Sequence, residues 1–132
     1  MKGHARDLMS PRVARATPET PLRELVERLV GGPFGGLPVV DADDEVIGFV
    51  SETDVTSALL RGEGSARAQD VMTTDVVTVD EFATSDEVMR LLEKRALHHL
   101  PVVRGGKLVG IIAPHDVLRF FLKHLPPRPI AG

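Results

Sequence analysis

Apolar residues recur along the chain in two blocks that share one pattern. Residues 22–30 (LRELVERLV) and 85–95 (SDEVMRLLEKR) carry apolar side chains at helical spacing. Residues 37–50 and 100–112 each contain two short runs rich in β-branched residues, separated by a turn rich in Asp or Gly, which is the pattern of a β-hairpin. A second helical segment follows each hairpin. The pattern predicts the order strand, helix, strand, strand, helix, and it predicts this order twice.

The two blocks are copies of one series of motifs. Three matched segments identify the copies: DLMSPRV (7–13) with DVMTTDV (70–76), LPVV (37–40) with LPVV (100–103), and VIGFVSETDV (46–55) with LVGIIAPHDV (108–117). The first two pairs are separated by 63 residues and the third by 62, because one residue has been lost in the hairpin turn. The chain is therefore a tandem repeat.

A repeat of about 60 residues that occurs twice predicts a pseudo-symmetric pair, since each half alone would expose an apolar face to water. We expect the first repeat at 1–64 and the second at 65–125, together forming one module. The remaining residues, 126–132, contain three prolines and predict an irregular tail.

Two helix starts can be predicted from local signals. Thr20 followed by Pro21 is typical of an N-cap residue followed by proline at the first helical position. Thr84 and Glu87 have the three-residue spacing of a capping box. Both helices are therefore expected to begin at a threonine.

Composition narrows the class of protein. With 132 residues and 42% apolar composition the chain can bury one ordinary core, and no stretch approaches the roughly 20 apolar residues that span a bilayer. The first residues lack the apolar run of a secretory signal, so we expect a cytoplasmic protein without a membrane partner. The absence of cysteine excludes disulfides and thiolate metal sites. A net charge of -3, with no Trp or Tyr, argues against nucleic-acid binding.

Candidate chemistry lies in GFVSETD (48–54) and in its copy GIIAPHD (110–116), which each place an aspartate at a helix start. A carboxylate there caps free N–H groups and is favoured by the helix dipole. The same acceptor can also take two hydrogen bonds from a vicinal diol such as that of a ribose, with Ser51 supplying a hydroxyl nearby. The spacing alone leaves both interpretations open.

The pair His98–His99 precedes LPVV in the second repeat, where the first repeat has Gly35–Gly36. Neighbours on an extended strand face opposite sides, so joint action requires a bend or a helix end. The alternatives are a grip for an anion, metal or catalytic groups together with His115 and His124, and ordinary boundary residues. The histidine spacing fits no standard zinc pattern, and no His-Glu-x-x-His helix is present.

These motifs, in this order and repeated, resemble a tandem of cystathionine β-synthase-type (CBS) domains, the arrangement called a Bateman module. The resemblance covers residues 7 to about 122. It implies an α/β (α+β) fold in which two pseudo-symmetric β-α-β-β-α repeats pack sheet to sheet. It also implies two related clefts that commonly hold AMP, ADP, ATP or S-adenosylmethionine as a regulatory ligand.

The resemblance assigns roles to individual residues. The ribose would be held by Ser51, Asp54 and Asp116, and the phosphates by His98 and His99. The adenine pocket would be lined by residues that follow the Met of each copy: Ser10, Pro11, Val13, Thr73 and Val76. In the second copy Ala113 replaces the hydroxyl residue of the motif.

The two clefts are expected to be unequal. The first cleft would combine Ser51 and Asp54 with the two histidines, whereas the second cleft would combine Asp116 with two glycines that offer no cation. We therefore expect the first cleft to bind nucleotides better, by about tenfold or more if one charge-assisted hydrogen bond is lost.

The resemblance predicts a regulatory module that is not an enzyme, that has no obligatory cofactor or metal, and that signals to an unidentified effector protein. The family often forms homodimers through its helices, for which VLRFFL (117–122) is a candidate. The alternative is a module without a ligand that acts only through protein contacts or dimerisation.

Overall fold

The structure is a computed structural model that describes residues 2–95 and 97–124. The elements of the first sequence repeat are α1 (Ala5–Leu8), α2 (Leu22–Gly31), β1 (Gly36–Val40), β2 (Val46–Ser51) and α3 (Glu52–Leu60). Those of the second are α4 (Ala68–Val71), β3 (Val79–Asp80), α5 (Ser85–Lys94), β4 (Leu100–Arg104), β5 (Lys107–Ile112) and α6 (Pro114–His124). The predicted irregular tail at 126–132 lies outside the described residues.

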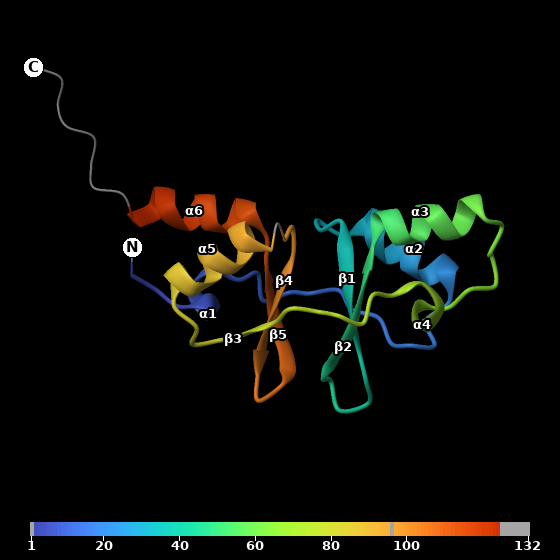
Figure 1. The fold of residues 1–132 in the computed structure, drawn as a ribbon, viewed down its shortest axis with the longest axis horizontal. Coiled ribbons are helices and arrows are strands. Elements are labelled where there is room, and N and C mark those ends of the chain that lie inside the picture. Colours follow the sequence, from blue (N-terminus) through green and yellow to red (C-terminus); the bar gives the residue numbers. More distant parts are fainter. Residues whose placement is uncertain (1, 96, 125–132) are drawn as a thin grey trace, which may run out of the picture.

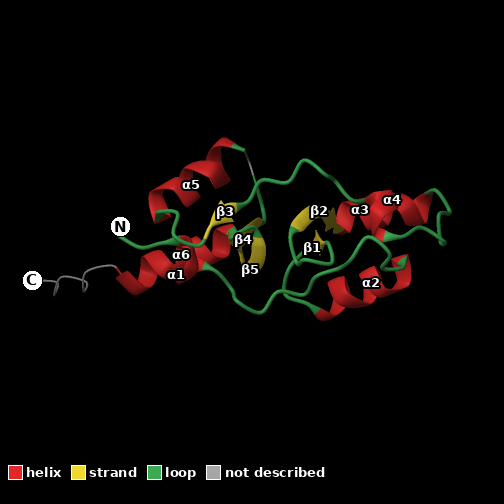
Figure 2. Ribbon diagram, turned by 90° about the horizontal axis from the view of Figure 1, so that it is seen from below, coloured by secondary structure: helices red, strands yellow, loops and turns green. Residues whose placement is uncertain are grey.

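Each repeat is built on an antiparallel hairpin. β1 pairs with β2 and β4 pairs with β5, and each pair contains one register irregularity. The hairpins lie next to each other at the centre of the molecule, and the longer helices lie toward the two ends (Figures 1 and 2). A bridge between Glu45 and Lys107 joins the two hairpin turns. This arrangement confirms the predicted α+β fold class, and none of the described helices is long and apolar enough to cross a bilayer.

The first predicted strand differs between the repeats. In the second repeat it is β3, which pairs in parallel with β4 through Val79 and Val102. In the first repeat the equivalent pairing is reduced to a single parallel bridge between Ala16 and Val39. The backbone N–H of Ala16 donates to the Pro38 carbonyl at 2.9 Å, so the contact is kept although no strand forms.

One of the two predicted helix starts is wrong by one residue. α2 begins at Leu22 with Pro21 as its N-cap, and the hydroxyl of Thr20 instead accepts the N–H of Thr17 at 3.0 Å. Thr20 therefore closes a turn before the helix. The prediction for Thr84 is confirmed, since it caps α5 and its hydroxyl accepts the N–H of Glu87 at 3.2 Å.

The two hydrophobic cores exchange their first helices. Ala5 and Leu8 of α1 belong to the core formed by β3, β4, β5, α5 and α6 of the second repeat. Ala68 of α4, at the start of the second repeat, belongs to the core formed by β1, β2, α2 and α3. Figure 1 shows α1 beside α5 and α6, and α4 beside α3. Each repeat therefore completes the core of the other, and separating them would expose both.

Next to each exchanged helix, a methionine packs against a glycine in the hairpin of the other repeat. A Cβ on Gly110 would lie 2.3 Å from the Sδ of Met9, and one on Gly48 would lie 2.5 Å from the Sδ of Met72. Just beyond each methionine, the backbone pairs with the partner hairpin, Ser10 with Ile111 and Thr73 with Phe49. The Met and Gly positions of the repeated motifs are thus two halves of one packing contact.

Replacement of Gly110 by alanine should destabilise the protein, because a methyl group has no room between the strand and Met9. Overpacking of this kind costs about 1–3 kcal/mol. Urea denaturation of Gly110→Ala measures the loss. The matched control is Gly64→Ala, where the added Cβ meets nothing within 4 Å and φ is not positive. Equal stability of Gly110→Ala and the wild type would contradict the packing contact.

Candidate functional site

A capping box fixes Ser51 and Asp54 at the start of α3. The Ser51 hydroxyl accepts the N–H of Asp54 at 3.1 Å, and the Oδ2 of Asp54 accepts the N–H of Ser51 at 2.8 Å. Each side chain thus satisfies a helix N-terminal N–H that would otherwise lack a partner. The structural interpretation of the Ser-x-x-Asp spacing is correct, and the box also presents both side chains at one strand-to-helix turn.

Asp54 and Asp116, the equivalent aspartates of the two repeats, differ in their burial and in their hydrogen-bond partners. Asp116 is 5% exposed; its Oδ2 accepts the N–H of Ala113 at 2.7 Å and its Oδ1 accepts from Nη1 of Arg119 at 3.1 Å. Asp54 is half-buried, and no donor among the described residues reaches its Oδ1. Of these two aspartates, only Asp54 therefore keeps a carboxylate oxygen that no donor in the described part of the chain reaches.

A cavity of about 380 Å³ opens in front of Asp54, between the two repeats. One wall comes from β2 and α3 of the first repeat, and the others come from the segments 73–77 and 95–101 of the second. The lining residues are Phe49, Ser51, Asp54, Thr73, Asp75, Val76, Val77, Arg95, Leu97, His98, His99 and Pro101. This is the predicted first cleft, and its volume lies within the range of roughly 300–1,000 Å³ of small-molecule sites.

The two histidines reach the first cleft together because the chain bends at His98, just before β4. His98 is exposed, whereas His99 is half-buried. The His99 ring lies 5.3 Å from the Phe49 ring, measured between centroids, and 6.5 Å from the Phe34 ring, which it meets edge to face. His99 therefore packs against aromatic side chains of the other repeat.

This packing changes the acidity of His99. Burial lowers its pKa below the ordinary value of 6.5, and the neighbouring His98 lowers it further, while Glu52 at the start of α3 acts in the opposite direction. Desolvation disfavours the charged imidazolium, so the ring is held mainly neutral at pH 7. An anion bound in the first cleft would favour the protonated form.

Several lining residues, among them Phe49, Arg95 and Leu97, were not predicted from the sequence. Asp75 belongs to the segment predicted to line the adenine pocket but was not singled out as a site residue. Asp75 lies within the segment that follows the Met of the second repeat, and Arg95 lies just beyond α5. Comparison of the repeats could have indicated Phe49, because an aromatic residue stands where the second copy has Ile111.

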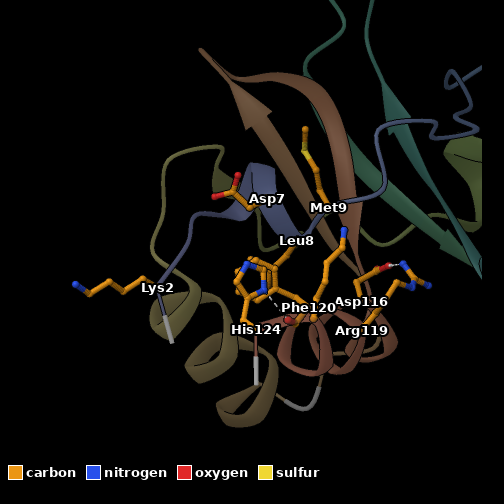
Figure 3. A pocket seen from close by; sticks show the side chains of 9 residues that line it. Lys2, Asp7, Leu8, Met9, Asp116, Arg119, Phe120 and His124 are labelled. Atoms are coloured by element: carbon orange, nitrogen blue, oxygen red, sulfur yellow. Dashed lines mark hydrogen bonds and ion pairs between the residues drawn. The ribbon is translucent and has the colours of Figure 1, made fainter. Parts of the chain in front are cut away.

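The other predicted site residues, Ser10, Pro11, Val13 and Asp116, are not among those that line the first cleft. Ser10 pairs through its backbone with Ile111, Pro11 is exposed and Val13 is half-buried. Asp116 lines a different cavity, of about 570 Å³, together with residues of α1 and α6. Figure 3 shows its carboxylate turned toward Arg119. The roles of Ser10, Pro11, Val13 and Asp116 in ligand binding stay predictions.

The other two candidate histidines, His115 and His124, are not among the residues that line the first cleft. His115 is exposed near the start of α6, and His124, at the end of α6, stacks on Phe120 with ring centroids 4.1 Å apart. Within residues 2–95 and 97–124, no group of three or more His, Asp or Glu side chains is arranged to hold a metal ion.

The family model of the CBS domain matches this chain twice, over residues 5–61 and 68–123. Together with the two hairpin-based repeats and the cavity between them, this match shows that the chain belongs to the CBS-domain family.

Similar proteins extend the comparison. An uncharacterised 33.4 kDa protein in the ribosomal RNA operon of Thermofilum pendens is 38% identical over 99 residues, covering 75% of this chain and 33% of that protein. The inosine-5'-monophosphate dehydrogenase of Halobacterium salinarum is 32% identical over 107 residues, covering 80% of this chain and 21% of the enzyme. This chain thus spans a third or less of the length of these two relatives. The match to the dehydrogenase therefore says nothing about a catalytic activity of this chain.

A solved structure of CBSX2 in complex with AMP has the same fold. It superposes with a TM-score of 0.81 at 29% sequence identity, covering 91% of this chain and 96% of that one. The correspondence over nearly the whole of both chains confirms the arrangement of two paired repeats.

Proposed function

We propose that the chain is a regulatory module that binds an adenosine-containing ligand, AMP, ADP, ATP or S-adenosylmethionine, in the first cleft. The observation that carries this proposal is a single cavity that joins Ser51 and Asp54 of one repeat to His98 and His99 of the other. The AMP complex of the similar protein CBSX2 supports the class of ligand.

Each wall of the first cleft would make a different contact with such a ligand. The Oδ1 of Asp54 is free to accept from a ribose hydroxyl while its Oδ2 keeps the helix cap. The segment around Thr73 and Val76 would face the adenine, and the two histidines would face the phosphate. Because these groups come from both repeats, the ligand would contact both at once.

The second cleft is the weaker candidate. Both Asp116 oxygens already have protein partners, and Gly35 and Gly36 offer no side-chain donor. A ligand there would have to share the Asp116 carboxylate with Ala113 and Arg119, and this side chain is only 5% exposed. We therefore propose that a ligand contacts the second cleft only at a higher concentration than the first cleft needs. The residues concerned are Asp116, Ser10, Pro11 and Val13.

Regulation would follow from the bridging position of the ligand. A ligand that touches both repeats binds one relative orientation better than others and shifts the population toward it. An effector protein docked on the module would respond to that shift. A role that rests on protein contacts without any ligand is the alternative function, favoured by the apolar side chains exposed on the helices.

The first test distinguishes ligand binding at Asp54 from ligand binding at Asp116. Asp54→Asn keeps an oxygen that can accept the Ser51 N–H but removes the charge, so it should preserve the fold and weaken AMP binding about tenfold or more. Asp116→Asn is the matched control and should leave AMP affinity within about twofold. Isothermal titration calorimetry measures both. Loss of binding in Asp116→Asn alone would show that the ligand occupies the second cleft.

A second prediction concerns pH. The pKa of His99 is lowered in the free protein and should rise when phosphate binds, so binding takes up a proton between these two pKa values. Affinity for AMP should therefore fall as pH rises, and should be tighter at pH 6 than at pH 8. Titration calorimetry at both values, in buffers of different ionisation enthalpy, measures the affinity and the proton uptake.

Since a phosphate group itself titrates near pH 6, the wild type must be compared with His99→Gln. The variant should lose most of the pH dependence that the wild type shows. Identical pH profiles for the two proteins would exclude a contact between His99 and the phosphate.

We further propose a homodimer formed through the helices. Leu118, Phe121 and Leu122 of α6 are 64%, 48% and 72% exposed, and Leu60 of α3 is 88% exposed. Covering these side chains in a second copy would remove apolar area from water. Sedimentation equilibrium should give twice the chain mass of 14.3 kDa, and a monomer at all concentrations would contradict the dimer.

A further inference from the structure

The first cleft carries little positive charge. Its lining contains the carboxylates of Asp54 and Asp75, the guanidinium of Arg95, and the imidazoles of His98 and His99. The two carboxylates outnumber the one guanidinium, and Glu52 adds a further negative charge close to His99. A site that binds polyphosphates usually presents several cations to them.

Asp75 and Arg95 are not neutralised by partners within the protein. Among the described residues neither side chain forms an ion pair or a hydrogen bond. Their charges therefore act on whatever occupies the first cleft. Asp75 is exposed, so its field is screened by salt but is not cancelled by a neighbour.

The fold does not require an aspartate at position 75. Its counterpart in the first repeat, 63 residues earlier, is Arg12, and both repeats keep the same backbone bridge just after the preceding methionine. The side chain of Asp75 caps no helix and pairs with no donor in the described part of the chain. Its negative charge is therefore available for selecting a ligand.

Resting on the proposed function, we propose that the first cleft selects adenosine ligands with no more than one phosphate, and that the Asp75 carboxylate discriminates against di- and triphosphates. Each added phosphate brings further negative charge into a cleft whose lining already carries the carboxylates of Asp75 and Asp54, while one guanidinium and two imidazoles are present to compensate. A volume of about 380 Å³ is near the lower end of small-molecule sites and also favours the smaller ligands.

The test compares adenosine, AMP, ADP and ATP by isothermal titration calorimetry at pH 8 and low salt, with EDTA present so that no divalent cation neutralises the phosphates. Wild-type protein should bind AMP about tenfold or more tightly than ATP, since two further charges in a cleft that carries the carboxylates of Asp54 and Asp75 cost about that factor at aqueous dielectric. The ratio should shrink as salt is added.

Two variants assign this selectivity to Asp75. Asp75→Asn should bring the ratio of ATP to AMP affinity about threefold closer to one, and Asp75→Arg, which copies the residue of the first repeat, should favour ATP. Asp43→Asn removes the same charge from the β1–β2 turn, at the other end of the hairpin from Ser51, and should change nothing.

The outcomes distinguish failure of the charge selection from failure of the proposed function. Binding of the compounds with ATP equal to or tighter than AMP in the wild type would leave the proposed function standing and overturn the charge selection. An unchanged ratio in both Asp75 variants would also overturn it. If none of the compounds binds, the proposed function fails and the selectivity fails with it.

Discussion

The packing of Met9 on Gly110 and of Met72 on Gly48 fastens each repeat to the other. These contacts seat α1 in the core of the second repeat and α4 in the core of the first. Because neither core is complete without a helix from the other half, the relative position of the hairpins is set by buried apolar packing. The first cleft lies beside one of these contacts, since Thr73 immediately follows Met72 and is paired with Phe49.

Pseudo-symmetry places an aspartate at the start of α3 and another at the start of α6, but the surroundings differ. Arg119 occupies one oxygen of Asp116, and the equivalent position in the first repeat is Ser57, which is too short to do so. His99 has the same asymmetry, since the first repeat has glycine there. The duplicated fold thus supplies two similar strand-to-helix turns. Within the described residues, a few substitutions between the repeats leave Asp54, but not Asp116, with a carboxylate oxygen that no protein donor reaches.

Much of this fold could be predicted because the chain contains two copies of one motif series, which can be compared with each other. The shared LPVV runs and the Thr84 cap identify hairpins and a helix start without further information. The exchange of α1 and α4 could not be predicted, because two copies of the same motif series leave open which copy packs on which core. The shift of the α2 N-cap from Thr20 to Pro21 follows from a competing hydrogen bond, in which the Thr20 hydroxyl accepts the N–H of Thr17.

The predictions for the site were less complete, for a different physical reason. Ser51 and Asp54 belong to a local motif, and its spacing is visible along the chain. Asp75 and Arg95 come from separate segments of the second repeat, and only the folded chain shows that they line one cavity with Asp54 of the first repeat. The bend at His98, which lets both histidines reach the first cleft, was foreseen only as a condition for their joint action.

The most direct measurement is a crystal structure of the protein grown with AMP. The ligand is expected in the first cleft, with ribose hydroxyls within hydrogen-bond distance of the Asp54 carboxylate and the phosphate facing His98 and His99. AMP bound at Asp116 with the first cleft empty would contradict a ligand site centred on Asp54, and so would crystals in saturating AMP that contain no ligand.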